Sequence, residues 1–440
     1  MHRLRSILDS LHSSLWFVPA LMIVGAAALA LGLGEIDANL DRARLQERWP
    51  WLFGAGAAGA RGTLAAIAGS MITIAGVAFS ITIVALTLAS SQYTSRILRN
   101  FMRDRANQSV LGAFVGIFIY CLVVLRTIRG GDEGAFVPPL AVLVAVLLAF
   151  VGIACLIFFI HHIASGIQAE TIIKAAADET IDAVNRLFPQ EMGEAAGGPV
   201  ASVAPAADQR WQEVPAQLTG FIQGVDGDAL LRAAAEMQTI IRMERGVGEF
   251  VVEGAPLISI ASGVPDEDFA ARIDAIYTIG HQRTMVQDAG FGIRQIVDVA
   301  LKALSPGIND TTTAVVCVNY LSAILARLAA RRIESPYRID KSELRVIARG
   351  PTFDGMLAEA FDQIRQNGPG NIAVLLAVLT ALEVIADRTQ NAQRRAALRH
   401  QAGLIGETAR RSIPEPRDVR SVEEVVKRLD RKLADAHTPG

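Results

Sequence analysis

Long runs without a charged residue alternate with short charged segments before His161, and the alternation stops there. Four stretches contain no Asp, Glu, Lys or Arg: Leu15–Gly34, Gly62–Ser95, Ala106–Leu125 and Gly134–Ile160. Each can cross a hydrocarbon core of about 30 Å as a helix, which takes roughly 20 residues. We therefore predict about four transmembrane helices. The first is expected to be retained, because its apolar run is longer than that of a signal peptide.

After Gln168 the composition becomes that of a soluble protein, although the whole chain is 51% hydrophobic. The predicted fold is an α-helical membrane domain followed by a cytoplasmic α+β domain. Its expected parts are a transmembrane domain over residues 1–165, a connecting helix over 166–188, a flexible linker over 189–210, a small β-rich domain over 211–265 and a mainly helical domain over 266–440.

Short β-type segments separated by glycines predict a small barrel-like unit in the β-rich domain. They are Gly220–Ile222, Thr239–Met243, Glu249–Val252 and Pro256–Ile260, with a short helix expected over Asp228–Met237. Gly246–Leu257 resembles the hairpins of biotinyl and lipoyl carrier domains, but the region contains no lysine, so covalent cofactor attachment is excluded there. Helical periodicity follows from Glu267, with a possible strand pair over Tyr337–Arg349.

The second uncharged stretch carries a regular series of small and hydroxyl residues. Its roughly 34 residues would form a helix about 50 Å long, on which residues seven positions apart share one face. The candidate pore-lining residues on this face are Gly69, Thr73, Gly76, Ser80, Thr87 and Thr94. Such a stripe allows close packing between helices, or it supplies hydroxyls to a water-filled path.

Arg96, Arg99 and Arg103 follow this stripe at a spacing that places them on one helical face. In an oligomer they would form an electropositive inner mouth of a channel. The alternative is ordinary anchoring of a cytoplasmic loop at the lipid headgroups. Counts of Lys and Arg on the two sides are equal. The acidic residues in the first outer loop and a large C-terminal domain without disulfides favour cytoplasmic N and C termini.

Several classes of function lack support in the sequence. The net charge is −2 and there is no long basic stretch, so nucleic-acid binding is not expected. The three cysteines are far apart and His161–His162 has no further ligands at recognisable spacing, so no metal site is expected. The uncharged spans disfavour an ion-coupled pump relative to a passive channel.

Asn309 and Asp310 lie in the segment Ser305–Ala314 between two expected helices. Pro306 and Gly307 end the first helix, and Asn309 or Asp310 can cap the second. A tight turn explains these residues; a ligand site at the helix N-terminus is the alternative.

Two segments of the chain are similar to a known family. Phe79–Thr127 and Phe291–Ala314, with its Ala-Leu-Ser-Pro-Gly-Ile-Asn-Asp sequence, resemble the bacterial predicted membrane proteins called domain of unknown function 2254. The resemblance extends over nearly the whole chain. It implies a multi-pass protein of the bacterial inner membrane with a cytoplasmic domain, and it supplies no mechanism.

The leading hypothesis is an oligomeric, passive ion-conducting channel whose second transmembrane helix lines the path. Its expected partners are the lipid bilayer, further copies of the chain and ions. The second hypothesis is a non-conducting scaffold or sensor whose cytoplasmic domain binds a partner or ligand. Motifs for nucleotide binding, nucleophilic hydrolysis or zinc proteolysis are missing, so no enzyme is expected. A lipid-modifying enzyme would have to use Ser90, Ser91, His161 and His162.

Overall fold

The computed structural model describes residues 16–39, 56–92, 104–129, 136–166, 168–188, 209–341 and 343–434. These residues fall into two compact units, here called the N-terminal and the C-terminal unit, which divide between Thr171 and Ile172. Most of the predicted linker, Thr94 and the three arginines of the predicted inner mouth lie outside the described residues.

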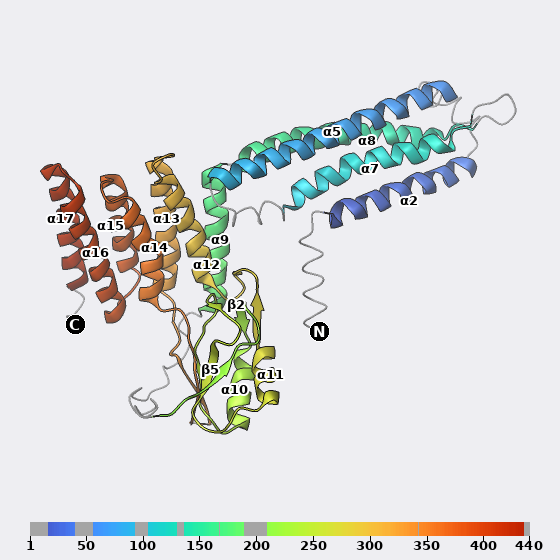
Figure 1. Ribbon diagram of the computed structural model, residues 1–440. Helices are drawn as coiled ribbons and strands as arrows, with labels where there is room; N and C mark the ends of the chain where they lie inside the picture. The colour runs from blue at the N-terminus through green and yellow to red at the C-terminus, as the bar shows by residue number, and fades with distance from the viewer. Residues whose placement is uncertain are drawn as a thin grey trace. The chain divides into compact units, whose positions relative to one another are not determined.

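Four long apolar helices make up the described part of the N-terminal unit. They are α2 (Phe17–Asn39), α5 (Ala57–Gln92), α7 (Arg105–Thr127) and α8 (Pro139–Gly166). α7 contacts the other three and lies between α2 and α5 (Figure 1). Each is long and apolar enough to cross a membrane, which confirms the prediction of several membrane helices.

Glycines allow α2 to lie close against α7. A Cβ atom on Gly112 of α7 would lie 2.7 Å from Sδ of Met22 and 3.0 Å from Cα of Pro19. One turn further along, a Cβ on Gly116 would be in ordinary contact with Ala26. Small residues at such positions bring two backbones together, which is a main source of helix association in lipid.

The helices run beyond the uncharged stretches, so the expectation of spans without charged residues is wrong at the helix ends. Asp37, in the last part of α2, is fully buried. Its carboxylate accepts hydrogen bonds from the backbone N–H groups of Leu140 at 3.2 Å and Ala141 at 3.0 Å. It therefore caps the N-terminus of α8, whose first residue is a proline that needs no partner. Arg61 of α5 donates to the carbonyl of Ile128, just after α7, at 3.0 Å.

The described strands of the C-terminal unit form two open sheets. They are β1 (Gln212–Pro215), β2 (Gly220–Val225), β3 (Ile241–Met243), β4 (Phe250–Val251), β5 (Pro256–Ile260), β6 (Tyr277–Gly280), β7 (Tyr337–Asp340) and β8 (Glu343–Ile347). The strand orders are β1-β5-β3-β8-β7 and β4-β2-β6. The predicted strand segments are confirmed, whereas a barrel-like closure is not.

Strands from outside residues 211–265 complete both sheets. β8 pairs in parallel with β3, and its Val346 lies opposite Ile241 within the same buried core. β6 pairs with β2. The helices α10 (Gly227–Glu236) and α11 (Glu267–Ile276) also place Leu230, Phe269 and Ile273 in this core. The β-rich region is therefore built from segments far apart in the sequence.

The other helices of the C-terminal unit stand side by side (Figure 1). They are α9 (Ala169–Leu187), α12 (Ala289–Ala303), α13 (Thr311–Ala329), α14 (Phe353–Asn367), α15 (Ile372–Ala386), α16 (Ala392–Ser412) and α17 (Pro416–Ala434). Neighbour contacts give two layers, α12-α14-α16 and α13-α15-α17. α8 ends at Gly166 and α9 begins at Ala169, so α9 lies within the range of 166–188 predicted for a connecting helix.

α13 is a fifth helix that is long and apolar enough to cross a membrane. It contacts α12, α14 and α15 within the C-terminal unit, and Cys317, Leu321 and Leu325 are fully buried there. A helix that is apolar on most sides is either enclosed in a protein core or exposed to lipid. Packing among its neighbours accounts for the apolar surface of α13.

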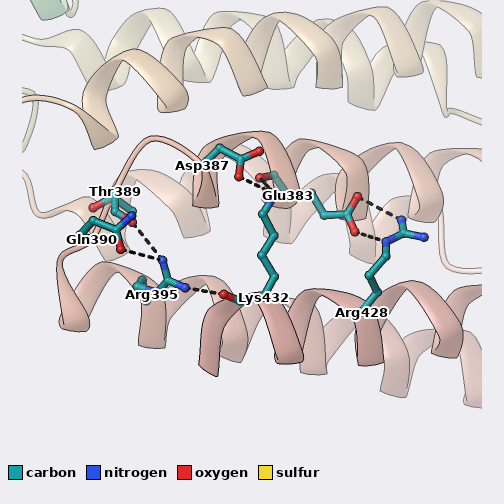
Figure 2. A network of polar contacts seen from close by, with 7 residues as sticks. All are labelled: Glu383, Asp387, Thr389, Gln390, Arg395, Arg428 and Lys432. Carbon is teal, nitrogen blue, oxygen red and sulfur yellow. Dashed lines mark hydrogen bonds and ion pairs between the residues drawn. The ribbon is translucent and has the colours of Figure 1, made fainter. Parts of the chain in front are cut away.

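A polar network attaches α17 to α15 (Figure 2). Arg428 donates to both carboxylate oxygens of Glu383, at 2.7 and 3.1 Å, and Lys432 pairs with Asp387 at 2.6 Å. The guanidinium of Arg395 in α16 donates to the carbonyl of Lys432 at 2.5 Å. Exposed ion pairs contribute little singly, but this set fixes the last helix at several points along its length.

The contact between α9 and α12 gives a test of this fold. A Cβ on Gly292 of α12 would overlap Oγ1 of Thr180 in α9. We expect Gly292→Ala to lower the free energy of unfolding by about 1–3 kcal/mol, because overpacking outweighs the gain in helix propensity. Thermal unfolding of the full-length protein measures the effect. Gly403→Ala in α16, where a Cβ meets open space, is the matched control and should stabilise by about 0.5–1 kcal/mol. Equal shifts for both variants would contradict this packing.

Candidate functional site

The small and hydroxyl residues predicted to line a pore lie along an exposed face of α5. Gly69, Thr73, Gly76, Ser80 and Thr87, here called the α5 stripe, are all exposed on the N-terminal unit. A Cβ added at Gly69 or Gly76 would meet no atom within 4 Å. The stripe is therefore not used for packing among the described helices of its own unit.

The opposite side of α5 is the one that packs within the unit. Its buried residues are Ala60, Leu64, Ala68, Met71, Ala75, Ala78 and Ala85. At about 100° per residue these positions fall on roughly the other side of the helix from the stripe. Both α7 and α8 contact α5. The helix thus has one small-residue face turned inward and a second turned away from its own unit.

Hydroxyl groups of the α5 stripe donate to their own helix. Thr73 Oγ1 bonds to the carbonyl of Gly69 at 2.8 Å, and Ser80 Oγ bonds to that of Gly76 at 2.9 Å. Thr87 Oγ1 does the same with Ile83 at 2.8 Å. The donors are satisfied, so these residues are tolerated in an apolar environment. What remains available to a neighbour is the oxygen lone pairs and the glycine backbone.

Large apolar side chains flank the α5 stripe. Ile72, Val77 and Val84 are 44%, 52% and 66% exposed, as expected of residues that face lipid chains. A shallow strip of small groups between such residues lets another helix approach closely. With oxygens along it, the same strip can also line a path for water and ions when several copies face one another.

His162 is bound at the end of α8 that leads to α9. Its Nε2 lies 2.5 Å from Oδ2 of Asp104, and its ring stacks on that of Phe158. Asp104 also accepts from the N–H of Ala106 and caps α7. His161 is exposed. Within the described ranges no group of three or more His, Cys, Asp or Glu side chains could hold a metal ion.

Asn309 and Asp310 form the connection between α12 and α13. Asn309 has a positive φ of 50°, which asparagine tolerates better than most residues. The carboxylate of Asp310 accepts from the N–H of Thr313 at 3.0 Å and from its hydroxyl at 2.6 Å. These two hydrogen bonds hold the pKa of Asp310 below its ordinary value, and the bond from the Thr313 hydroxyl has the larger effect. The carboxylate is thus engaged in capping α13.

Two pockets in the C-terminal unit could hold a ligand or a peptide. One of about 840 Å³ lies between α14 and α16 and is lined by Asp354, Asp362 and His400 among others. A second of about 480 Å³ is lined by charged residues that include Arg283, Asp288 and Arg349. Arg283 is paired with Asp288 at 2.8 Å and Arg349 with Glu249 at 2.6 Å. None of these residues stood out in the sequence, because they come from separate segments without a shared spacing.

Comparison with known proteins places the chain among membrane proteins. The family model described as "Predicted membrane protein", domain of unknown function 2254, matches residues 12–384. An uncharacterized protein of Mycobacterium bovis and two of Mycobacterium tuberculosis, strains H37Rv and CDC 1551, are each 34% identical over 430 residues. These alignments cover 95% of this chain and 80% of each relative. No solved structure matches the chain significantly.

Replacing Asp310 tests whether its side chain stabilises the protein by capping α13. Asp310→Ala should lower the free energy of unfolding by about 0.5–2 kcal/mol at pH 7, the usual loss for an N-cap. Asp310→Asn, which keeps an acceptor, should retain most of it. Thermal unfolding of the full-length variants measures both.

The pH dependence of the same variants follows from the lowered pKa of Asp310. The stabilisation by the charged carboxylate is complete above the unfolded-state pKa of about 3.9 and is lost as the pH falls through the lower folded-state value. The stability margin, which is the difference in the free energy of unfolding between the wild type and Asp310→Ala, should therefore shrink only in that acid range. A margin that instead grew on acidification would rule out this account of the cap.

Proposed function

The chain belongs to the family of predicted membrane proteins called domain of unknown function 2254, and we propose that it works as a homo-oligomeric, passive ion-conducting channel. In this assembly the α5 stripes of several copies face one another around the path. The observation that carries the proposal is the orientation of the stripe, which is exposed and lies opposite the face that α5 buries within its own unit. No catalytic role is proposed.

The spacing of the α5 stripe suits contact between copies of α5. Gly69 and Thr73, and then Gly76 and Ser80, are pairs of small residues four apart that recur after seven residues. Such pairs support close approach of membrane helices, and a seven-residue repeat keeps two helices in contact at a shallow crossing angle of about 20°. In a ring of more than two copies, the oxygens of Thr73, Ser80 and Thr87 would face the centre.

A second candidate function is a non-conducting scaffold or sensor. It is favoured by the hydrogen bonds of the stripe hydroxyls to their own helix, which make the stripe equally suited to dry packing. It is also favoured by the pockets of about 840 and 480 Å³ in the C-terminal unit. In this case α5 assembles the protein and the C-terminal unit binds a partner.

We also propose a location in the bacterial inner membrane with both termini in the cytoplasm. Four membrane helices return the chain to its starting side. The C-terminal unit contains one cysteine, Cys317, which is free and buried, so this unit has no disulfide framework of the kind common in secreted domains.

Assembly through the α5 stripe is tested by Gly69→Leu. The leucine meets open space in the single copy, so the fold should be kept, but its side chain should separate two facing copies of α5. We expect the dissociation constant of the oligomer to rise at least tenfold, about 1.4 kcal/mol, as measured by light scattering or cross-linking in detergent. Ala154→Leu on the exposed surface of α8 is the control. An unchanged oligomer in Gly69→Leu would place the contact elsewhere.

Conduction is tested by opposite charges at Thr87. In a water-filled path, Thr87→Asp should raise and Thr87→Lys should lower the cation-to-anion flux ratio of proteoliposomes, by about tenfold between the two variants. In a dry contact the same charges would cost about 2.5–3.5 kcal/mol each and disrupt assembly instead. Thr87→Val, which removes only the hydroxyl, is the neutral control. Equal flux from all variants with an intact oligomer supports the scaffold.

A further inference from the structure

A groove with an apolar lining runs between α2 and α5. Both helices pack on α7, which lies between them (Figure 1), and residues of α7 form part of the groove lining. Its volume is about 450 Å³, and its apolar lining includes Ile23, Phe79, Ile83, Leu111, Val115 and Phe159. All lining residues belong to the N-terminal unit, and they come from each of its four described helices.

One amide in the groove has no partner. Asn107, near the start of α7, lines the groove and is only 6% exposed. Neither its side-chain nitrogen nor its side-chain oxygen makes a hydrogen bond. A buried amide without partners is costly, and most so in an apolar environment. An apolar groove with such an amide in its lining suits a molecule that combines an apolar chain with a hydrogen-bonding group.

Nearby polar groups are already engaged. The carboxylate of Asp104, one turn before Asn107, is held by His162 at 2.5 Å and by the N–H of Ala106 at 2.9 Å. Thr82 lines the groove, but its hydroxyl donates to the carbonyl of Ala78 at 2.8 Å. Among the described residues that line the groove, Asn107 therefore has both a free donor and a free acceptor.

We infer that the groove holds a phospholipid of the surrounding bilayer, with one acyl chain along α7 and the glycerol ester region at Asn107. The Asn107 N–H donates to an ester carbonyl, and its oxygen accepts from a headgroup or glycerol hydroxyl. Asn107 is the third residue of α7, so it lies at the depth where the ester groups of a bilayer begin. From there to Val115 the helix descends about 12 Å, at 1.5 Å per residue.

The size of the groove selects a lipid chain over a second copy of the protein. A helix with side chains is about 10 Å wide, so a 12 Å length of it would occupy roughly 900 Å³. That is about twice the volume of the groove. A single acyl chain is narrow enough to enter between α2 and α5 from the bilayer.

The test uses the full-length protein in detergent with added dioleoyl phosphatidylglycerol. Bound lipid is counted by native mass spectrometry, and the shift in melting temperature caused by the lipid is recorded. For the wild type we expect one tightly bound lipid per chain and a rise in melting temperature. Asn107→Leu should weaken binding about tenfold, while its lipid-free melting temperature stays equal or rises, because the unpaired amide is gone.

A second variant fills the groove. Ala20→Trp places a large side chain between α2 and α5 from an exposed position on α2 and should abolish the bound lipid. Ala154→Trp, exposed on α8 outside the groove, should leave it unchanged.

Three outcomes would overturn the inference. They are full lipid binding by both groove variants, binding of oleate but not of the phospholipid, and a change of oligomer mass in Asn107→Leu without a change in bound lipid. All three are read from bound lipid and oligomer mass and not from flux, so they are decided separately from conduction even though Gly76 of the α5 stripe also lines the groove.

Discussion

The N-terminal unit depends on the enclosure of α7 by the three other helices. Helices inside a bilayer are already out of water, so the hydrophobic effect does not drive them together. They associate through close packing and through hydrogen bonds between polar groups. Gly112 and Gly116 supply the close approach to α2, and the alanines of α5 supply it on the other side. Because α2 and α5 both pack against α7, α7 separates them from each other. The groove between them and the outward face of α5 are both consequences of that one arrangement.

The two ends of the helix bundle differ in how their polar groups are satisfied. At one end, Asp37 closes the N-terminus of α8 and Arg61 closes the C-terminus of α7. Those bonds join four chain segments and leave the end fixed. At the other end, Asp104 and His162 bind each other, but the amide of Asn107 remains open. Among the described residues, this end therefore keeps an amide that can bind another molecule, and the proposed lipid contact lies there.

Local patterns predicted a large part of the fold. Uncharged runs located the four membrane helices, β5 was predicted at its observed bounds, and Asp310 was identified as a possible cap before α13. The sheets were less predictable, because β8 reaches β3 across about one hundred residues and β6 follows directly on a helix without a glycine or proline between them. Pairing over such distances leaves no periodic signal.

The α5 stripe and the groove at Asn107 also differ in how far the sequence predicts them. The α5 stripe could be read from spacing alone, because it lies on one helix, and the structure adds that its face is turned away from the unit. Asn107 lies at the start of an uncharged run, directly before the polar residues Gln108 and Ser109, and an uncharged amide in that position is not distinguished from its neighbours by sequence. The Asn107 amide lacks a hydrogen-bond partner because none of the four described helices around it supplies one. No single segment of the sequence shows that. A polar residue in an apolar helix is informative only once its surroundings are known, whereas a repeat of small residues is informative on its own. That difference decides which of the two features the sequence could predict.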